Sequence, residues 1–262
     1  MTLRWVPGWN GLTEPEAVSY VAAVEAADGQ DLEFGVAKAI NDFVVGCKND
    51  GIWDAIKASC ILAGARTLEG ALVPLVGAAP TNFNFVTGDY NRETGLVGDG
   101  STKYLDSNRN SSSDPNTSIH QSIYISTAHL SGAGVYIGAG QPGSPGAIHF
   151  GVNRVTDNFF ARNRNGSAND ISVAGGATGF AGASRGDSSL YSLRINSSST
   201  SFAVTAEASV NLNHFIFDRN ASNARLPTNA RLAFYSIGES LDLAALDTRV
   251  SNLITAIGAA IP

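Results

Sequence analysis

The stretch that decides the fold is residues 95–125, GLVGDGSTKYLDSNRNSSSDPNTSIHQSIYI, because the helical spacing of apolar residues ends before it and strand spacing begins within it. Residues 98–101, Gly-Asp-Gly-Ser, combine glycine's access to positive φ with an Asx side chain, which predicts a sharp turn. Residues 102–105 then predict a short strand, and residues 108–118 a polar loop. In residues 118–126 isoleucines alternate with polar residues, which predicts a half-buried antiparallel strand.

Short strand candidates continue after this stretch at intervals of about 10 to 15 residues, the spacing typical of a β-sandwich. Asn165-Gly166 favours a type I′ hairpin turn that joins residues 158–164 to residues 168–173. Residues 232–237 are apolar on both faces, which predicts a central strand covered by helices. The chain therefore predicts a mainly β sandwich.

Helical patterns flank these strands at both ends of the chain. Thr13 with Glu16 fits a capping box for a first helix that should end near residues 28–29, and Asp31 is placed to cap a second that should end at residues 49–51. A third helix is expected to begin at Ile52. Ser240 is placed to cap a C-terminal helix whose apolar stripe spans only about two heptads. Docking of that helix on its own sandwich is therefore favoured over a coiled-coil seam between subunits. We expect residues 1–80 to be a helical segment packed on the sandwich, and residues 81–262 to be the sandwich with its C-terminal helix.

Residues 95–125 resemble a family of laminin-G-like, concanavalin-A-like jelly-roll modules found in tailed-bacteriophage and prophage virion proteins. The resemblance takes in residues 51–56 before the block, residues 179–180 and 183–185 after it, and the end of the C-terminal helix at residues 256–261. It covers residues 36–262 and consists of small and apolar residues rather than a catalytic signature. It implies a concanavalin-A-like jelly-roll sandwich in a virion and leaves any reaction unspecified.

Charge and hydropathy exclude several other classes of protein. The net charge is −6, and residues 1–80 hold 5 basic and 10 acidic residues, so the chain lacks the basic patch that nucleic-acid binding requires. The most apolar stretch, residues 71–80, is short and interrupted by Pro74, so no membrane insertion is expected. No export signal is recognisable near the start, which predicts synthesis in the host cytoplasm.

Catalytic and redox chemistry find little support in the sequence. Concanavalin-like glycoside hydrolases need two carboxylates at a defined separation. The only glutamates after residue 80 are Glu93, Glu207 and Glu239, and none lies in an acidic strand. We therefore expect no enzyme. Cys47 and Cys60 match no zinc or redox spacing and are expected on helices as buried free thiols.

Metal ligands are not predicted either, and no cofactor is expected. The histidines have no metal-binding spacing and are expected at the surface. Four oxygen-bearing side chains between residues 99 and 114 offer hard ligands for calcium. Turn formation is their commoner role, and the sequence leaves open whether a loop binds calcium. Residues 185–187, Arg-Gly-Asp, predict an ordinary turn. The histidines are His120, His129, His149 and His214, and the oxygen-bearing residues are Asp99, Asp106, Asn108 and Asp114.

Aromatic residues supply the only candidate binding contacts. Tyr104, Tyr136 and Tyr191 are candidate glycan contacts, because an aromatic face stacks on a sugar ring, although packing at strand edges is the commoner fate of such a residue. Trp5 and Trp9 are candidate subunit contacts, although docking inside the chain is favoured for them.

The resemblance implies a non-enzymatic virion structural protein of a tailed bacteriophage, whether in a tail fibre, at the baseplate or on the capsid surface. Its expected partners are other virion proteins, further copies of itself with a trimer favoured, and host surface glycans. Two alternatives remain open. One is a soluble carbohydrate-binding, lectin-like module, and the other, less favoured, is a polysaccharide depolymerase.

Overall fold

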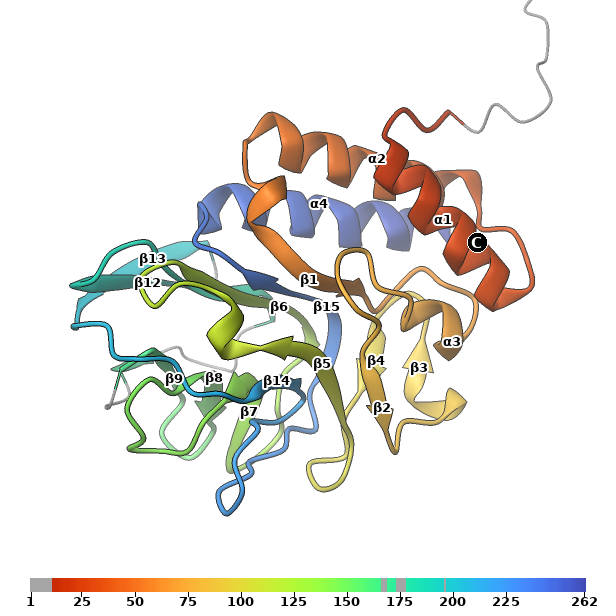
Figure 1. Cartoon of the computed structure of the whole chain (residues 1–262). Coiled ribbons are helices and arrows are strands. Elements are labelled where there is room, and N and C mark those ends of the chain that lie inside the picture. Colours follow the sequence, from red (N-terminus) through yellow and green to blue (C-terminus); the bar gives the residue numbers. More distant parts are fainter. Residues whose placement is uncertain (1–10, 166–168, 173–177, 196) are drawn as a thin grey trace, which may run out of the picture.

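The computed structural model describes residues 11–165, 169–172, 178–195 and 197–262. These residues form two antiparallel β-sheets packed face to face, with a layer of helices on the outer face of one sheet (Figure 1). The helices are α1 (Pro15–Asp28), α2 (Phe34–Asn49), α3 (Leu68–Ala71) and α4 (Leu243–Ala260), with 3-10 turns at Trp53–Ala55, Thr87–Asp89 and Ser111–Ser113. The strands are β1 (Ile56–Ile61), β2 (Thr81–Phe83), β3 (Tyr90–Asn91), β4 (Gly95–Val97), β5 (Tyr104–Asn110), β6 (Ile119–Thr127), β7 (Ala133–Ala139), β8 (Ile148–Asn153), β9 (Asn158–Asn163), β10 (Asn169–Ser172), β11 (Gly179–Arg185), β12 (Leu190–Ile195), β13 (Ser198–Ala203), β14 (Asn213–Ile216) and β15 (Arg231–Gly238).

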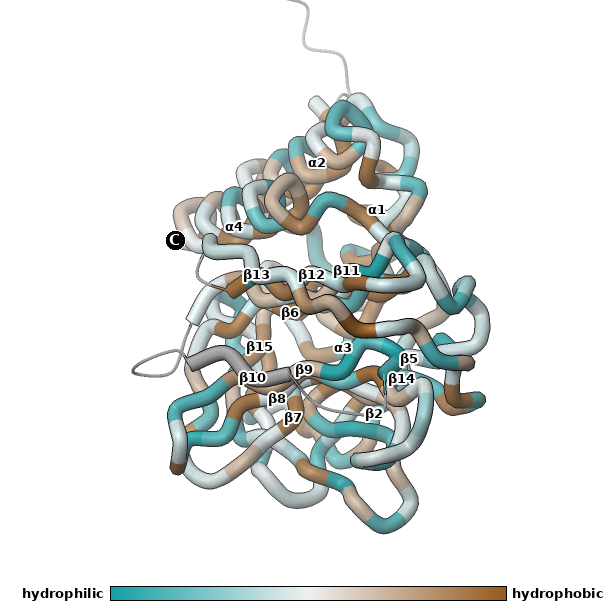
Figure 2. The backbone as a smooth tube through the Cα atoms, turned by 90° about the vertical axis from the view of Figure 1, so that its left-hand side faces the viewer, coloured by the Kyte–Doolittle hydropathy of each residue, from teal (hydrophilic) through white to brown (hydrophobic). Residues whose placement is uncertain are grey.

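The two sheets differ in what covers them. The helix-side sheet has the strand order β13-β12-β11-β6-β15-β4-β3, with β1 beside β15, and the outer sheet has the order β10-β9-β8-β7-β14-β5-β2. Figure 2 shows the helices, the helix-side sheet and the outer sheet as three successive layers. One core lies between the two sheets and includes Leu105, Ile123 and Phe150, and a second lies between the helices and the helix-side sheet and includes Phe43 and Leu246. The expected sandwich with an N-terminal helical layer and a C-terminal helix is confirmed.

Strands β6 and β15 form the centre of the helix-side sheet. They pair antiparallel, with Tyr235 opposite Ile123, and the prediction of a central strand over residues 232–237 is confirmed. The expectation that β6 is only half-buried is wrong, because the helical layer covers the face that carries His120 and Ser122. The Ser122 hydroxyl lies 2.7 Å from that of Ser236, a hydrogen bond that satisfies two buried polar groups.

The third helix expected from Ile52 is not present. A 3-10 turn at Trp53–Ala55 leads into β1, which pairs with β15 and joins the helix-side sheet, so Cys60 lies on a strand. Trp53, Ile56 and Cys60 also fit helical spacing, which is why a helix was expected here. Five of the six residues of β1 are buried, including the polar Ser59, so neither face of the strand is left open to solvent. Residues 56–61 thus contribute a strand to the sandwich from within the expected helical segment.

The helices end as predicted, but they begin differently. Gly29 closes α1 with φ of 65°, the left-handed conformation that glycine adopts without strain. The expected caps Thr13 and Asp31 are wrong, since the N-cap residues of α1 and α2 are Glu14 and Glu33, and neither makes a side-chain cap bond. The Asn41 side-chain oxygen accepts the backbone N–H groups of Thr13 at 2.7 Å and Glu14 at 3.1 Å instead, so a tertiary contact replaces the local cap.

The C-terminal helix α4 docks on its own chain. Asp242 caps it in place of the expected Ser240, accepting the N–H of Ala244 at 2.7 Å. Ion pairs of 2.7 Å tie Asp247 to Arg194 on β12 and Arg249 to Asp50 after α2. The preference for docking over an intersubunit seam agrees with this packing.

Two further expectations concern the hairpin and the membrane. Strands β9 and β10 pair antiparallel with Ala161 opposite Asn169, as a hairpin requires, while Gly166 of the expected turn lies outside the described residues. Among the described residues, none of the helices has both the length and the apolar character needed to span a bilayer.

Candidate functional site

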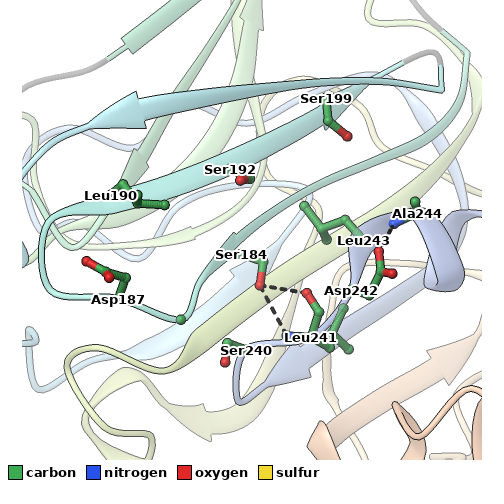
Figure 3. Close-up of a pocket in the computed structure, with 11 residues that line it drawn as sticks. Ser184, Asp187, Leu190, Ser192, Ser199, Ser240, Leu241, Asp242, Leu243 and Ala244 are labelled. Carbon is green, nitrogen blue, oxygen red and sulfur yellow. Dashed lines mark hydrogen bonds between the residues drawn. The ribbon is translucent and has the colours of Figure 1, made fainter.

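A groove with a volume of about 370 Å³ lies between the start of α4 and the neighbouring strands of the helix-side sheet (Figure 3). Three segments form it: the end of β11 with the turn after it, the outward-facing residues of β12 and β13, and the chain entering α4. Its lining residues are Ser184, Gly186, Asp187, Leu190, Ser192, Ser199, Ser240, Leu241, Asp242, Leu243 and Ala244. The site thus combines residues that are up to 60 positions apart in the sequence.

The serine hydroxyls connect the walls of the groove. The Ser184 hydroxyl donates to the Leu241 carbonyl at 3.0 Å and accepts the Leu241 N–H at 3.1 Å, which joins β11 to the segment before α4. The Ser199 hydroxyl accepts a hydrogen bond of 3.1 Å from Arg194, a residue that also pairs with α4. Because secondary-structure elements and these bonds set its walls, the groove is formed before any ligand arrives.

The two carboxylates of the groove are hydrogen-bond acceptors. Asp187 accepts from the Ser189 hydroxyl at 2.6 Å, and Asp242 accepts from the first turn of α4. The Ser189 hydroxyl, then the backbone N–H groups of the turn and the charge of Arg185, lower the pKa of Asp187. The lining contains no basic side chain, so the groove is suited to a neutral ligand rich in hydroxyl groups and repels an anion.

The three candidate tyrosines do not form a site together. Tyr136 and Tyr191 are 1% and 0% exposed in the inter-sheet core, so neither presents a ring face to solvent. Tyr104 is half-buried, and its ring already has partners, with Phe83 stacked at 4.3 Å and the Arg225 guanidinium 3.9 Å from the ring centroid. Buried packing, rather than sugar stacking, accounts for Tyr136 and Tyr191.

Burial also decides whether Arg185 and the four histidines can contact a ligand at the surface. Arg185 is fully buried, so residues 185–187 are not displayed as a recognition tripeptide. The expectation of surface histidines is wrong, because all four are buried, and burial lowers the pKa of His120 to about 4 and of His149 to about 3. A polar strand face predicts exposure to solvent, and this prediction fails where another part of the fold covers the face. Trp5 and Trp9 lie outside the described residues.

The oxygen ligands considered for calcium serve turns and ion pairs. Asp99 accepts the backbone N–H groups of Ser101 and Thr102, both at 2.8 Å; burial raises its pKa, but these bonds outweigh that effect and lower the pKa far below its usual range. The Asp114 carboxylate pairs with Arg109 at 2.5 Å. In the part of the chain that the structure describes, no group of three or more His, Cys, Asp or Glu side chains is placed to hold a metal ion.

The Ser-lined groove was missed by sequence analysis because its residues share no motif. Isolated serines in a Ser-rich chain carry no local signal, and only the antiparallel register of β11, β12 and β13 places them near the start of α4. Residues 241–243 follow the expected cap Ser240, so the sequence placed them in a helix and gave no sign that they line a groove.

No protein-family model matches this sequence, and no curated protein matches it. Among solved structures, one of botulinum neurotoxin type C, whose cell entry depends on interaction with two ganglioside molecules, has a TM-score of 0.50 and 11% identity over 78% of this chain and 52% of that chain. The botulinum neurotoxin serotype D binding domain scores 0.47 at 12% identity over 76% and 51%, and the Ruminococcus gnavus IT-sialidase CBM40 scores 0.40 at 12% identity over 52% and 83%. The chain spans about half the length of the neurotoxin chains. At this identity, the type C likeness shows a shared sandwich fold alone.

Proposed function

We propose that this chain is a non-enzymatic sandwich module that binds neutral glycans in the groove at the start of α4, and that it serves as a structural protein of a tailed-phage virion. The observation that carries the glycan part is the groove itself, which presents serine hydroxyls and two carboxylates on a rigid frame. The sandwich of botulinum neurotoxin type C, whose cell entry depends on gangliosides, is consistent with glycan binding by a fold of this kind, and the neutral character of the sugar is inferred from the groove alone. The virion setting rests on the sequence resemblance.

The chemistry of the groove suits a sugar without a carboxylate. Carboxylates and hydroxyls pair with sugar hydroxyl groups, and Leu190, 41% exposed, offers an apolar wall for the C–H face of a ring. The two Asp side chains disfavour sialylated or other acidic sugars by like-charge repulsion.

No aromatic ring lies in the lining, so we expect weak binding by a single copy. A dissociation constant near 1 mM corresponds to only about −4 kcal/mol. Display of many copies on one particle raises the overall avidity without new contacts. Weak individual grooves are therefore compatible with a repeated virion protein, in a tail fibre, at the baseplate or on the capsid surface, and with trimeric self-association.

Binding is favoured over hydrolysis by the state of the carboxylates. A glycosidase needs one carboxyl group with a raised pKa as its general acid. In the groove, Asp187 has a lowered pKa and accepts hydrogen bonds from Ser189, and Asp242 is used as a helix cap. Asp187 therefore does not have the environment of a proton donor.

The test uses a multivalent form of the full-length protein, tetramerised on streptavidin, on a glycan array and on host surface polysaccharide. Ser192→Tyr fills the groove and should abolish binding, whereas Ser113→Tyr, at an exposed serine outside the groove, should not. Binding that survives Ser192→Tyr, or no binding by the wild type, contradicts the groove assignment. Release of reducing ends would identify a depolymerase, and absence of the protein from purified particles by mass spectrometry would contradict the virion setting and leave a soluble lectin.

A further inference from the structure

Polar side chains replace the apolar core at one end of the space between the two sheets. Strand side chains alternate between faces, so residues two positions apart point the same way. Four polar residues lie two positions from an inter-sheet core residue of their own strand, and all four are buried. They are Gln121 (from Ile123 on β6), Asn163 (from Ala161 on β9), Arg185 (from Ala183 on β11) and His214 (from Ile216 on β14).

This end of the core also contains two guanidinium groups with no ion-pair partner among the described residues. Arg164 and Arg185 are both 0% exposed. Arg164 donates to the Asp114 carbonyl at 3.0 Å, and Arg185 donates to the carbonyl of Asn163 at 2.8 Å. These acceptors are uncharged backbone groups, and the Asp114 carboxylate is already paired with Arg109.

The charges persist at neutral pH. Burial first, then the nearby charge of Arg185, lower the pKa of Arg164 to about 10 against the opposing effect of Asp114. Arg164 therefore remains protonated near pH 7. Burial also lowers the pKa of Arg185, but a guanidinium group is not deprotonated in proteins. A buried charge is costly unless it is paired and hydrogen-bonded, so an anion beside these two guanidinium groups would stabilise the folded chain.

Several N–H donors at this end have no hydrogen-bond partner within the described protein. They are Nε of Arg164, Nη2 of Arg185, and the side-chain amide nitrogens of Gln121 and Asn163, whose amide oxygens are unpaired as well. Both ring nitrogens of His214 are also unpaired, and burial, followed by the charges of Arg164 and Arg109, lowers the pKa of His214 to about 3. His214 is thus neutral and supplies one further N–H. Buried polar groups that lack a partner in a native fold indicate bound water or an ion.

The backbone is also adapted to this arrangement. Arg164 has φ of 58°, a left-handed conformation that is strained for a non-glycine residue and persists only where the surroundings enforce it. The conformation directs the first residue after β9 into the space between the sheets, toward the loop at Ser111–Ser113 that closes that end.

We propose that this end of the inter-sheet core is a binding site for one small inorganic anion of the halide class, held by the unpaired N–H groups of Arg164 and Arg185 and supported by the amides of Gln121 and Asn163. A spherical anion accepts hydrogen bonds from several directions and donates none, which matches a site rich in N–H donors. Because Arg185 belongs to the helix-side sheet and Asn163 to the outer sheet, the anion joins the two sheets and is enclosed when the chain folds.

The decisive experiment replaces chloride with bromide during purification, refolding and crystallisation, and collects data at the bromine absorption edge. An anomalous peak in contact with Arg164 Nε and Arg185 Nη2 supports the proposal. Ordered water without anomalous signal at that position overturns it.

A solution measurement tests the same site independently. The melting temperature of the refolded protein is followed from gluconate into chloride or bromide at constant ionic strength, and it should rise and then saturate, since a ligand that binds only the folded state stabilises it. Gln121→Leu removes an amide donor without removing a charge and should weaken the halide response several-fold, whereas Arg249→Gln, at the paired arginine on α4, should keep it. Equal melting temperatures in gluconate and halide, or an unchanged response in Gln121→Leu, contradict the proposal.

Discussion

Replacement of Leu246 by alanine tests the docking of α4 most directly. Leu246 is 0% exposed and belongs to the core between the helices and the helix-side sheet. Truncation of a fully buried leucine removes its transfer free energy and leaves a cavity, which together cost about 3 to 5 kcal/mol. For a chain of this length, each kcal/mol lowers the melting temperature by about 2 to 4 °C, so the variant should melt about 6 to 20 °C below the wild type.

The assay compares Leu246→Ala with Asn252→Ala, an exposed position on the same helix. Far-UV circular dichroism in increasing guanidinium gives the free energy of unfolding, and light scattering gives the oligomeric mass. Asn252→Ala should stay within about 0.5 kcal/mol of the wild type. Because both variants carry alanine on the same helix, the difference between them isolates the buried contact from helix propensity.

Two results would refute this account of α4. If Leu246→Ala and Asn252→Ala melt alike, α4 does not belong to the core of the isolated chain. If deletion of residues 241–262 yields a soluble protein that melts like its parent and loses only oligomeric mass, α4 is an intersubunit seam. The packed structure predicts insoluble material instead, since the deletion exposes the apolar face of α2, including Phe43.

Three other measurements test separate features of the fold. Burial raises the pKa of both Cys47 and Cys60 to about 12, so a thiol reagent should label neither in the native protein and both after unfolding without reductant; one thiol or none would reveal a bridge. The buried histidines of β6, β8 and β14 have folded-state pKa values of about 3 to 4, below the 6.5 of the unfolded chain, so the unfolded state binds more protons as pH falls. Stability should therefore be lost between about pH 6.5 and pH 4, by about 1.4 kcal/mol per pH unit and histidine, and a flat profile there would contradict their burial. A Cβ at Gly146 would lie 1.6 Å from a backbone oxygen whereas one at Gly143 meets nothing within 4 Å, and both have positive φ, so Gly146→Ala should cost at least about 1 kcal/mol more than Gly143→Ala in guanidinium unfolding; equal costs would contradict the close approach.

Local sequence signals predicted the elements whose surroundings are simple. The alternation in β6, the two-sided apolar run in β15 and the glycine that closes α1 each follow from a short stretch of residues. The prediction failed at β1 because its apolar residues Ile56 and Cys60, with Trp53 before it, also fit the spacing of a buried helix. The prediction of a local cap failed at α1, because the side chain of Asn41, a residue distant in sequence, takes the place of the cap.

The candidate site could not be predicted, for a related reason. Tyr136 and Tyr191 carry the residue type that binds sugars, but the sandwich uses them as core. The groove is formed by serines that the register of β11 to β13 brings beside Asp242. Burial and proximity of this kind depend on which sheet face is covered, and no window of the sequence contains that information.

The position of α4 connects the proposed binding function to the folding of the chain. Leu243 contributes to the core beneath α4 and also lines the groove, and Asp242 both caps the helix and faces the groove. A glycan that binds the groove therefore binds only the docked form of α4 and stabilises it, and by reciprocity any change that loosens α4 weakens glycan binding by the same factor. A subunit seam that draws α4 away from β11 and β12 would dismantle the groove, so trimer formation through α4 and glycan binding at its start are competing uses of one helix. Self-association that preserves the groove must use another surface.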